Sequence, residues 1–462
     1  MRKDTVMNID LKNAKRLQTL KGWGTSACWW SQYCADENTA REIANLLYGD
    51  DGLRLNIYRY NVGGGTDENN YRVKDPWRRT ESFMLYDRET EETSWDFSRD
   101  KNAVNMMKLC LETGNVDTLI LFANSPHYSQ TSTGQASGSL LMHTCNIPKS
   151  NYRKFVDYFL TVTQHFLDEG FPVQYISPIN EPQWKWGGSY VWQEGCHYET
   201  EEMVEIYHIF AEEILRRNMP VKLYGPESGS MTENTKEYIE ALTADETIMK
   251  VLDIFAYHSY HHDDSPEVRF AFKKDFIEKY PQFRFDMSEW CELPNKSHTK
   301  NFKGALITAR VIGQDLVYAG AESWTSWVAV NGFAIHEDGY DYSDATITSN
   351  PDFSDWYIAK RYWGFAHYSK YIPVGSVALD IGYYTAKDNN SLNIFAFETT
   401  NGETVLVIVN EGEQTEIKLD GEYKEMRLIR SSQNEELSEI YNGEYKDSFV
   451  SDENSIITAI LK

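Results

Sequence analysis

Positive charge is scarce in this chain of 462 residues. Its 45 Lys and Arg residues stand against 70 Asp and Glu, which gives a formal net charge of −25 and an isoelectric point near 4.9. Nucleic acids and anionic membranes need basic patches on the proteins that bind them. The composition therefore argues against both as partners and fits a neutral substrate.

Long apolar runs are missing as well. No run approaches the length that spans a membrane. The first ten residues include Arg2 and Lys3 but no apolar segment of the kind that a secretory signal contains. The sequence therefore predicts a cytoplasmic protein, or a secreted one if a leader was trimmed, and it leaves the oligomeric state open.

Clustered metal ligands and cofactor motifs are also absent from the sequence. The six cysteines include no Cys-x-x-Cys pair, which suits reduced thiols better than a disulfide framework or a zinc site. The run 261–264, His-His-Asp-Asp, has metal-capable side chains, but sequence neighbours need not converge on one ion, so we expect a polar rim loop. The glycines at 63–65 lack the spacing and the lysine of a phosphate loop. No metal and no cofactor are predicted.

Aromatic residues, in contrast, are plentiful. They make up 14% of the chain, with 13 Trp and 30 Tyr. One interpretation is an aromatic-rich core, and the other is a set of exposed rings that stack on sugar faces. Composition alone favours the core.

Short β-rich apolar runs alternate with segments of helical period over most of the chain. The runs lie at residues 20–28, 53–62, 118–124, 173–180, 221–226, 251–258, 283–289 and 321–330. The helices expected between them include 39–47, 101–112, 152–169, 201–217 and 301–318. Eight runs favour a closed barrel over an open sheet, so we predict an α/β fold with a (β/α)8 TIM barrel at residues 20–372.

The pattern changes after a helical stretch at residues 355–371. Segments 391–397, 403–409 and 456–460 are β-rich, and Asn-Gly, Glu-Gly and Asp-Gly turns occur in this part of the chain. Such a pattern is typical of an antiparallel meander. We predict a small β-sandwich side domain at residues 373–462, joined by a first strand within residues 5–19.

Two strand ends carry a glutamate. Active sites of such barrels form at the carboxyl ends of the strands. One apolar run ends at Asn180 and Glu181 before a proline, and another ends at Glu289 beside Trp290. A pair of this kind suits glycosidic cleavage, in which one carboxyl protonates the leaving oxygen and the other attacks the anomeric carbon. Taken singly, each glutamate fits a helix cap or a surface acid equally well.

Several motifs resemble those of glycoside hydrolase family 30, a member of clan A of the retaining β-glycosidases. They are Gly22-Trp-Gly-Thr-Ser26, Tyr58-Arg-Tyr-Asn-Val-Gly-Gly64, Ala123-Asn-Ser-Pro126 followed by Gly134 and Gly138, Ser177-Pro-Ile-Asn-Glu-Pro182, and Ser288-Glu-Trp290. They occur in the family's order along the chain. The resemblance implies a barrel with a β side domain and a retaining glycoside hydrolase.

The resemblance also implies roles for the residues at these motifs. Glu181 would be the acid/base and Glu289 the nucleophile. Asn180 would hydrogen-bond the sugar 2-OH, and Arg59 would keep the nucleophile ionised. For Arg59 the alternative is a strand-end salt bridge. If Glu181 only binds substrate, the acid has to be sought elsewhere, with Glu194 or Glu227 considered first.

Further residues match the family's substrate-binding positions. His258 corresponds to a sixth-strand histidine, Tyr260 to a tyrosine that touches the nucleophile, and Trp327 to a sugar-stacking surface. For these aromatics the alternative is barrel core. The other candidates for substrate contact are Asn61, Trp29, His127, Tyr128, Glu194 and Trp290.

The branch within the family is harder to assign. Stretches 26–30 and 193–198 resemble the branch that cuts β-1,6-galactan, whereas 125–130 departs from it. Glu194, in the second stretch, either binds a substrate hydroxyl or is a solvated loop acid. The leading hypothesis is retaining hydrolysis of β-linked galactosides, either β-1,6-galactan or its oligosaccharides.

Two alternatives remain at this point. The same mechanism fits another β-glycoside, namely a glucoside, xyloside, fucoside or glucuronide. A non-catalytic glycan-binding protein is the other, which the intact glutamate pair disfavours. If the protein is cytoplasmic, short imported oligosaccharides are the expected substrates and attack at the chain end becomes plausible.

Overall fold

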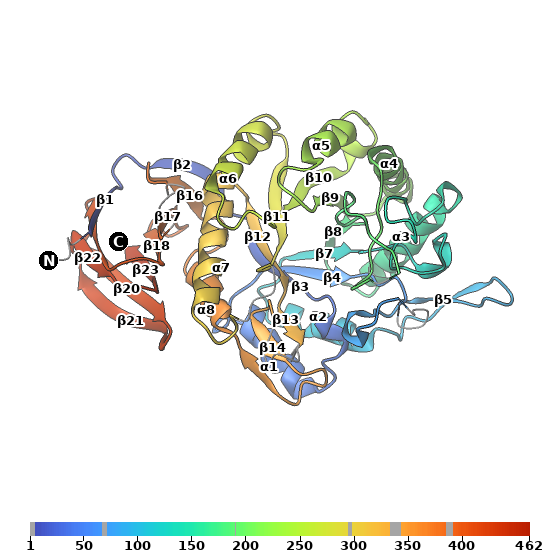
Figure 1. Ribbon diagram of the computed structural model, residues 1–462, viewed down its shortest axis with the longest axis horizontal. Coiled ribbons are helices and arrows are strands. Elements are labelled where there is room, and N and C mark those ends of the chain that lie inside the picture. The colour runs from blue at the N-terminus through green and yellow to red at the C-terminus, as the bar shows by residue number, and fades with distance from the viewer. Residues whose placement is uncertain (1–4, 67–71, 190, 294–297, 333–342, 385–390) are drawn as a thin grey trace.

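The computed structural model describes residues 5–66, 72–189, 191–293, 298–332, 343–384 and 391–462 (Figure 1). At its centre is a closed barrel of eight parallel strands in the spatial order β10-β11-β12-β3-β4-β7-β8-β9. The strands are β3 (Gly22–Ser26), β4 (Ile57–Asn61), β7 (Thr118–Phe122), β8 (Val173–Ser177), β9 (Lys222–Ser228), β10 (Leu252–His258), β11 (Arg284–Trp290) and β12 (Ser323–Val328). Each of the eight predicted runs overlaps one of them, so the predicted β/α barrel is confirmed.

Helices between the strands cover the outside of the barrel (Figure 1). They are α1 (Glu37–Tyr48), α2 (Lys101–Glu112), α3 (Tyr152–Asp168), α4 (Thr200–Arg217), α5 (Thr235–Thr243), α6 (Pro266–Phe272) and α7 (Lys303–Gly313). The helix expected at 301–318 is α7 followed by a π-helical turn, Gln314–Ala319. Gly320 ends this turn at a φ of +84°, a conformation that glycine adopts without steric cost.

The stretch 355–371 is not helical throughout. Its start forms a short strand, β15 (Trp356–Ile358), and only then does α8 (Lys360–Ser369) begin. Strand β15 pairs antiparallel with β14 (Ile347–Ser349). Strand β14 pairs in turn with β13 (Val330–Gly332), so residues 356–358 are the third strand of a small sheet, which the local helical period did not reveal.

The N-terminal residues and the C-terminal part of the chain form two further sheets beside the barrel. A seven-stranded sheet runs β2-β16-β17-β18-β23-β20-β21, and a three-stranded sheet runs β1-β19-β22. Their strands are β1 (Thr5–Asp10), β2 (Lys15–Thr19), β16 (Val377–Asp380), β17 (Leu392–Glu398), β18 (Thr404–Asn410), β19 (Thr415–Asp420), β20 (Glu425–Ser432), β21 (Glu435–Glu444), β22 (Ser448–Ser451) and β23 (Ser455–Leu461).

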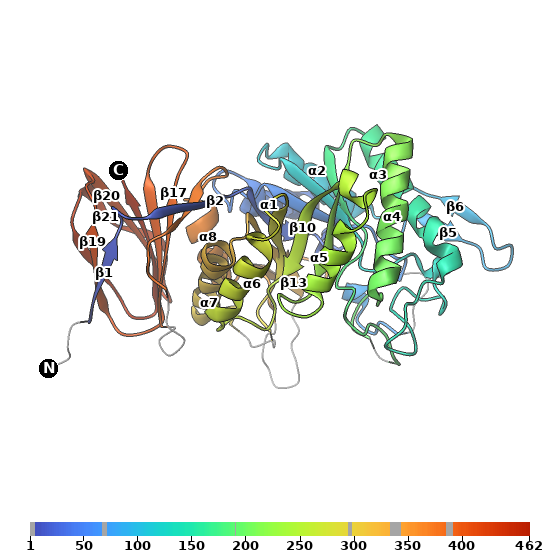
Figure 2. The same cartoon turned by 90° about the horizontal axis from the view of Figure 1, so that it is seen from above.

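The N-terminal residues contribute two strands to this region rather than the single one expected. Strand β1 pairs with β19 in the small sheet and β2 with β16 in the large one. Figure 2 shows both beside the C-terminal strands, with the two chain termini in the same region. We keep residues 20–372 and 373–462 with 5–19 as the proposed domain limits.

Strand β18 illustrates how the large sheet separates two hydrophobic cores. Val405, Val407 and Val409 belong to the core that includes the barrel, whereas Leu406 and Ile408 belong to the core shared with the small sheet. Successive side chains of a strand point to opposite faces, so a strand that is buried on both sides is apolar throughout. This explains the unbroken apolar run that marked the segment as β-rich.

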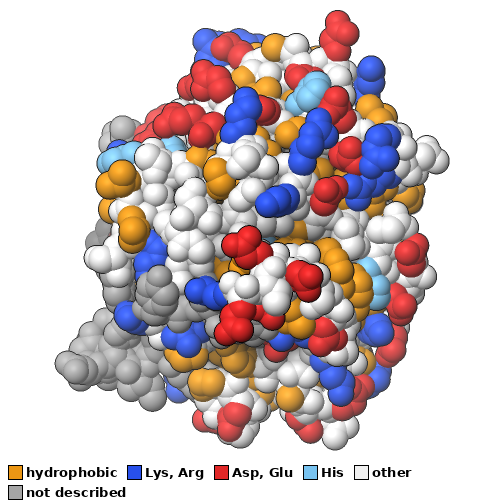
Figure 3. Space-filling view, turned by 90° about the vertical axis from the view of Figure 1, so that its right-hand side faces the viewer, with side chains coloured by type: hydrophobic (Ala, Val, Ile, Leu, Met, Phe, Trp, Pro, Cys, Tyr) orange, Lys and Arg blue, Asp and Glu red, His pale blue; other side chains and the backbone are white. Residues whose placement is uncertain are grey.

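The side of the molecule in Figure 3 carries acidic and basic side chains interspersed rather than gathered by sign.

No helix among the described residues is long and apolar enough to cross a membrane.

Candidate active site

The carboxyl ends of the barrel strands meet at one mouth of the barrel, and the predicted glutamates lie there. Glu289 is the last residue but one of β11, and Glu181 follows β8 by four residues. Both line a cavity of about 440 Å³, which is within the size range of small-ligand sites. The lining residues are Arg78, Glu181, Trp184, Lys185, Trp186, Gln193, Tyr260, His261, Glu289, Cys291, Leu293, Trp327 and Asp344.

The backbone at this mouth is unusual in two places. Glu181 and Glu227 both have left-handed φ angles, +48° and +55°. Side chains other than glycine seldom adopt this conformation, which persists where the surroundings hold it. The Glu181 amide donates to the Glu227 carbonyl over 2.9 Å, which ties the two turns together. The turn after β8 is thereby held at the edge of the cavity.

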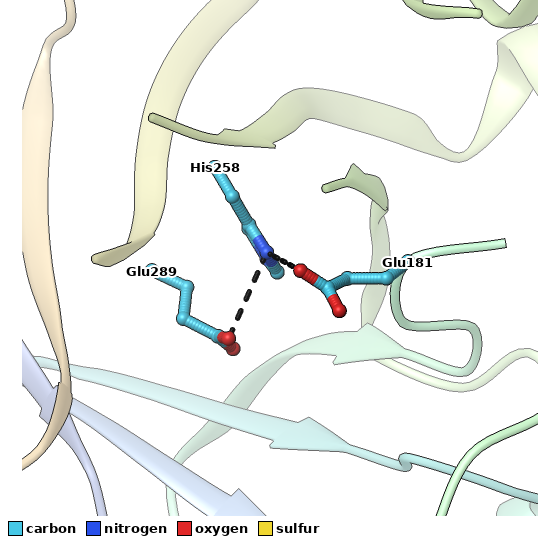
Figure 4. A group of neighbouring side chains, drawn as sticks. All are labelled: Glu181, His258 and Glu289. Carbon is cyan, nitrogen blue, oxygen red and sulfur yellow. Dashed lines mark hydrogen bonds and ion pairs between the residues drawn. The ribbon is translucent and has the colours of Figure 1, made fainter. Parts of the chain in front are cut away.

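Glu181, His258 and Glu289 point toward one another (Figure 4). One carboxylate oxygen from each glutamate and one ring nitrogen of His258 all lie within 4.8 Å of one another. His258 Nδ1 is 2.9 Å from Glu181 Oε1 and 3.7 Å from Glu289 Oε1. The histidine, at the end of β10, therefore contacts both carboxylates.

Glu289 has two further partners, both of which favour its ionised form. Arg59 on β4 donates from Nη1 to Glu289 Oε2 over 3.2 Å, and the Tyr260 hydroxyl donates to Oε1 over 3.0 Å. The Arg59 side chain is fully buried, with its guanidinium 4.0 Å from the centre of the Phe122 ring. The structure thus brings together the acid pair, Arg59 and Tyr260 as the sequence predicted.

Glu227, at the end of β9, contacts the same arginine and histidine as the predicted glutamates, and the sequence did not reveal these contacts. Its Oε1 accepts from Arg59 Nη2 over 3.0 Å, and its Oε2 lies 3.2 Å from His258 Nε2. The hydroxyls of Ser177 and Ser288 also donate to it. Glu227 thus contacts both Arg59 and His258, and it is not among the described residues that line the cavity. The strand-end rule that selected Glu181 and Glu289 selects Glu227 too, but the predicted run stopped one residue earlier, at Pro226.

Burial and mutual charge set the protonation of this cluster. Burial raises the pKa of Glu289 to about 7, although His258 and Arg59 act to lower it. For Glu227 burial also raises the pKa, but Arg59 and His258 outweigh this and bring it to about 2. Burial lowers the pKa of His258, whereas Glu289 and the other carboxylates raise it to about 10.

These directions give a simple charge balance. Arg59 and His258 both carry a positive charge at neutral pH, and Glu227 beside them is ionised. Glu289, with its pKa raised to about 7, titrates near neutral pH.

The predicted aromatic residues divide into two groups. Trp327 lines the cavity, and Trp29 packs edge-on against it with ring centres 5.3 Å apart. Trp290 is buried behind the site, where its Nε1 donates to Asp263 over 2.9 Å. Only Trp327 of the three offers a surface to the cavity.

The two asparagines are held differently. Asn180 is buried directly before Glu181, and its Oδ1 accepts no hydrogen bond within the described part of the chain. Asn61, at the end of β4, has its Oδ1 3.4 Å from Asn124 Nδ2. Asn180 is therefore the better placed of the two to bind a hydroxyl.

Three of the residues predicted to contact substrate are not among the described residues that line the cavity. They are His127, Tyr128 and Glu194, all in loops. Glu194 is fully buried and accepts from the Gly64 amide (3.0 Å) and from the hydroxyls of Thr66 (2.8 Å) and Thr80 (2.6 Å). Burial raises its pKa to about 7. The interpretation of Glu194 as a solvated loop acid is therefore wrong, and its oxygens bind neighbouring loops.

His127 and Tyr128 are also buried. Ser129 is the partner of the His127 ring, with Oγ 2.8 Å from Nδ1, and burial lowers the pKa of His127 to about 3. The Tyr128 amide donates to the Gly64 carbonyl over 2.9 Å. Both residues hold the loop after β7 in place against the loop after β4.

Sequence reasoning missed most of the cavity wall. Trp184, Lys185 and Trp186 come directly after the Glu181-Pro182 motif, and Arg78 comes from the loop after β4. The Trp-Lys-Trp run beside a strand-end glutamate was the available signal. In the run 261–264, His261 lines the cavity and Asp263 binds Trp290, in keeping with a rim loop.

Among the residues that the structure describes, one group has the spacing of a metal site, namely Glu181, His258 and Glu289. A histidine binds a metal through an unprotonated ring nitrogen. Here both ring nitrogens of His258 already contact carboxylates, Nδ1 that of Glu181 and Nε2 that of Glu227. These contacts account for the spacing of the group.

Comparison with known proteins identifies the family. The family model described as O-Glycosyl hydrolase family 30 matches residues 5–348. The chain belongs to this family. The predicted resemblance is confirmed, and the protein is an O-glycosyl hydrolase by family.

The chain is also similar to two curated proteins, at sequence identities of 25% and 22%. An endo-beta-1,6-galactanase of Hypocrea rufa is 25% identical over 240 residues, which cover 47% of this chain and 48% of the relative. An exo-beta-1,6-galactobiohydrolase of Bifidobacterium longum subsp. longum is 22% identical over 223 residues, 36% of this chain and 14% of the relative. The matched parts thus span about half of the first relative and a small part of the second.

A solved structure supports the fold. A conserved exported protein from Bacteroides fragilis superposes with a TM-score of 0.84 at 22% identity, covering 98% of this chain and 100% of that one. The likeness extends over the barrel and the two additional sheets.

Proposed function

We propose that the protein is a retaining β-glycosidase that hydrolyses β-linked galactosides, in particular β-1,6-galactan or its oligosaccharides. The observation that supports this most is the glutamate pair in the cavity, with one oxygen of each within 4.8 Å of the other. Retaining enzymes hold their two carboxyls about 5–5.5 Å apart, and inverting enzymes hold them farther apart to admit a water.

In the first step, the ionised Glu289 attacks the anomeric carbon as the glycosidic bond breaks. Glu181 gives its proton to the leaving oxygen, and an ester between the sugar and Glu289 forms. The hydrogen bonds from Arg59 and Tyr260 keep Glu289 ionised and oriented until it attacks.

In the second step, Glu181 is the base. It takes a proton from a water molecule, whose oxygen attacks the anomeric carbon and releases Glu289. The anomeric carbon is inverted twice, so the product keeps the β configuration. His258, in contact with Glu181 at 2.9 Å, stabilises the carboxylate that forms in the first step.

Substrate contacts follow from the same geometry. Asn180 carries a buried carbonyl oxygen without a protein partner in the described chain, which suits the sugar 2-OH. Trp327, supported by Trp29, offers a ring to the apolar face of the sugar. The choice of galactose and of the 1,6 linkage rests on the two relatives and on stretches 26–30 and 193–198.

The test is a panel of chromogenic β-glycosides together with β-linked disaccharides. We expect turnover of the β-galactoside and of β-1,6-galactobiose, with NMR of the first-formed product showing the β anomer. Preference for a glucoside, xyloside, fucoside or glucuronide would replace galactose in the proposal. An initial α anomer would contradict retention, and glycan binding without turnover would indicate a binding protein.

A further inference from the structure

The loop that follows the acid/base glutamate carries three tryptophans. Trp184 and Trp186 line the cavity, and the Trp186 Nε1 donates to the Glu181 carbonyl over 3.2 Å. Trp192 comes six residues later, directly before Gln193, which also lines the cavity. The loop therefore places two tryptophans in the cavity wall and a third next to a residue of that wall.

Trp192 is the most exposed aromatic side chain of the described chain, at 61% of its surface, against 45% for Tyr384 and 38% for Trp95. An indole of this size gains stability from burial, so an exposed one has no evident role in the core. Large apolar groups on a surface near a binding site commonly mark contact with a ligand or partner.

The backbone on either side of Trp192 is held in place. Val191 forms a bridge with Val73, and the Gly195 amide donates to the Ala136 carbonyl over 3.1 Å. Between them, Glu194 is bound by three groups of the loop after β4. The backbone that carries Trp192 is thus anchored on both sides, which lowers the cost of ordering this segment when a ligand binds.

The facing loop, after β7, is also apolar at its tip. Leu140, Leu141 and Met142 are exposed, and Ser139 bridges to Gly187 of the tryptophan loop. These three residues and Trp192 are four of the twelve large apolar side chains exposed in the described chain. The exposed apolar groups at this rim are therefore concentrated on two adjoining loops.

We propose that Trp192 stacks on a sugar ring of the bound chain outside the cavity, so that the enzyme favours chains longer than a disaccharide. The inference rests on the proposed function. Sugar rings have an apolar face of C–H groups that packs on indole, and the continuity of Trp192 with the cavity through Gln193 selects the glycan as the occupant.

The experiment compares kcat/KM for β-1,6-galactohexaose with kcat/KM for 4-nitrophenyl β-galactoside. Trp192→Ala is expected to lower the ratio of the two about fivefold through a higher KM for the hexaose, the size expected for loss of one stacking contact. Trp192→Phe, which keeps a ring, should restore at least half of the lost ratio. An unchanged ratio in Trp192→Ala would overturn the inference.

Two control variants test whether the change in the kcat/KM ratio comes from ring stacking by Trp192. Trp95→Ala removes another exposed tryptophan, on strand β6 (Thr93–Trp95), and should leave the ratio unchanged. Leu141→Ala removes an exposed side chain of the facing loop and should change the ratio less than twofold. An equal effect of Leu141→Ala and Trp192→Ala would mean a general apolar surface and would overturn ring stacking. Failure of the parent enzyme on both substrates would instead overturn the galactosidase proposal.

Discussion

Strand β18 and the mouth of the barrel are both buried, yet they contain opposite kinds of side chain. From Val405 to Val409 every side chain of β18 is apolar and fully buried. At the barrel mouth five ionisable groups lie buried in contact with one another: Arg59, Glu181, Glu227, His258 and Glu289. Apolar burial stabilises the fold, whereas burial of charge costs free energy unless each charge is paired.

The comparison indicates where stability and chemistry lie in this molecule. Substitutions in β18 should change the free energy of unfolding and leave turnover alone. Substitutions at the mouth should change turnover far more than folding. The charges at the mouth are tolerated because the carboxylates contact the cations Arg59 and His258.

The largest effect is expected at Glu289. Glu289→Gln removes the nucleophile, because an amide cannot form the glycosyl ester, so kcat should fall by about 10⁴-fold or more. The fold should persist, as measured by circular dichroism and thermal unfolding. Near-normal turnover of the variant would remove Glu289 from the mechanism.

The second-largest effect is expected at Glu181, and its size depends on the leaving group. Glu181→Ala should reduce cleavage of β-1,6-galactobiose by about 10²- to 10⁴-fold, because that bond needs a proton donor. Formation of the glycosyl-enzyme from an activated aryl galactoside should suffer much less, and the intermediate should accumulate because water lacks its base. Added azide should restore turnover and give a β-galactosyl azide.

A uniform loss across good and poor leaving groups, without azide rescue, would show that Glu181 only binds substrate. Glu227 would then be an unsuitable replacement, since its oxygens are already bound by Arg59, His258 and two serines.

A smaller effect, with a distinct pH signature, is expected at Glu227. Burial raises the pKa of Glu289 to about 7, so this carboxyl is protonated below that pH and cannot attack. The parent enzyme should therefore lose kcat/KM as the pH falls through about 7. Glu227→Gln removes a negative charge that raises this pKa, so the loss should begin at lower pH and the decline from pH 7 to pH 6 should be smaller than in the parent.

The control for this prediction is an activated aryl galactoside. Its kcat/KM in the parent enzyme should show the same decline below pH 7, because its first step also needs an ionised Glu289. A pH profile of Glu227→Gln that matches the parent, with only a uniform loss of rate, would mean a purely structural role for Glu227.

The smallest effect on turnover is expected in β18. Leu406→Ala creates a cavity between the two sheets and should lower the free energy of unfolding by about 2–5 kcal/mol, measured by urea denaturation. The kcat/KM of the folded variant should stay within about twofold of the parent. Lys418→Ala, at an exposed position of β19, is the matched control and should change stability by less than about 0.5 kcal/mol. Loss of activity in folded Leu406→Ala would link the sheets to the site.

Local sequence patterns were enough to predict the barrel and the acid pair. Each barrel strand is a short apolar run bounded by turn residues, and Glu181 and Glu289 stand where such runs end. The same patterns failed at residues 356–358, where pairing with β14 holds the chain extended, and at the N-terminus, where β1 and β2 pair with strands more than 350 residues away in the chain. Glu194 was misjudged because its burial depends on three groups from the loop after β4, more than 110 residues away in the chain.

The sequence by itself determined the order of strands and helices, the strand ends that carry glutamates and the family to which the chain belongs. These are properties of residues that are near one another in the chain, because side-chain period and turn preference act over a few residues. Only the tertiary structure decided which buried charges contact one another and which residues form the cavity wall. Arg59 meets Glu227 and Glu289 across 168 and 230 residues of sequence, and closure of the barrel is what brings these charges together.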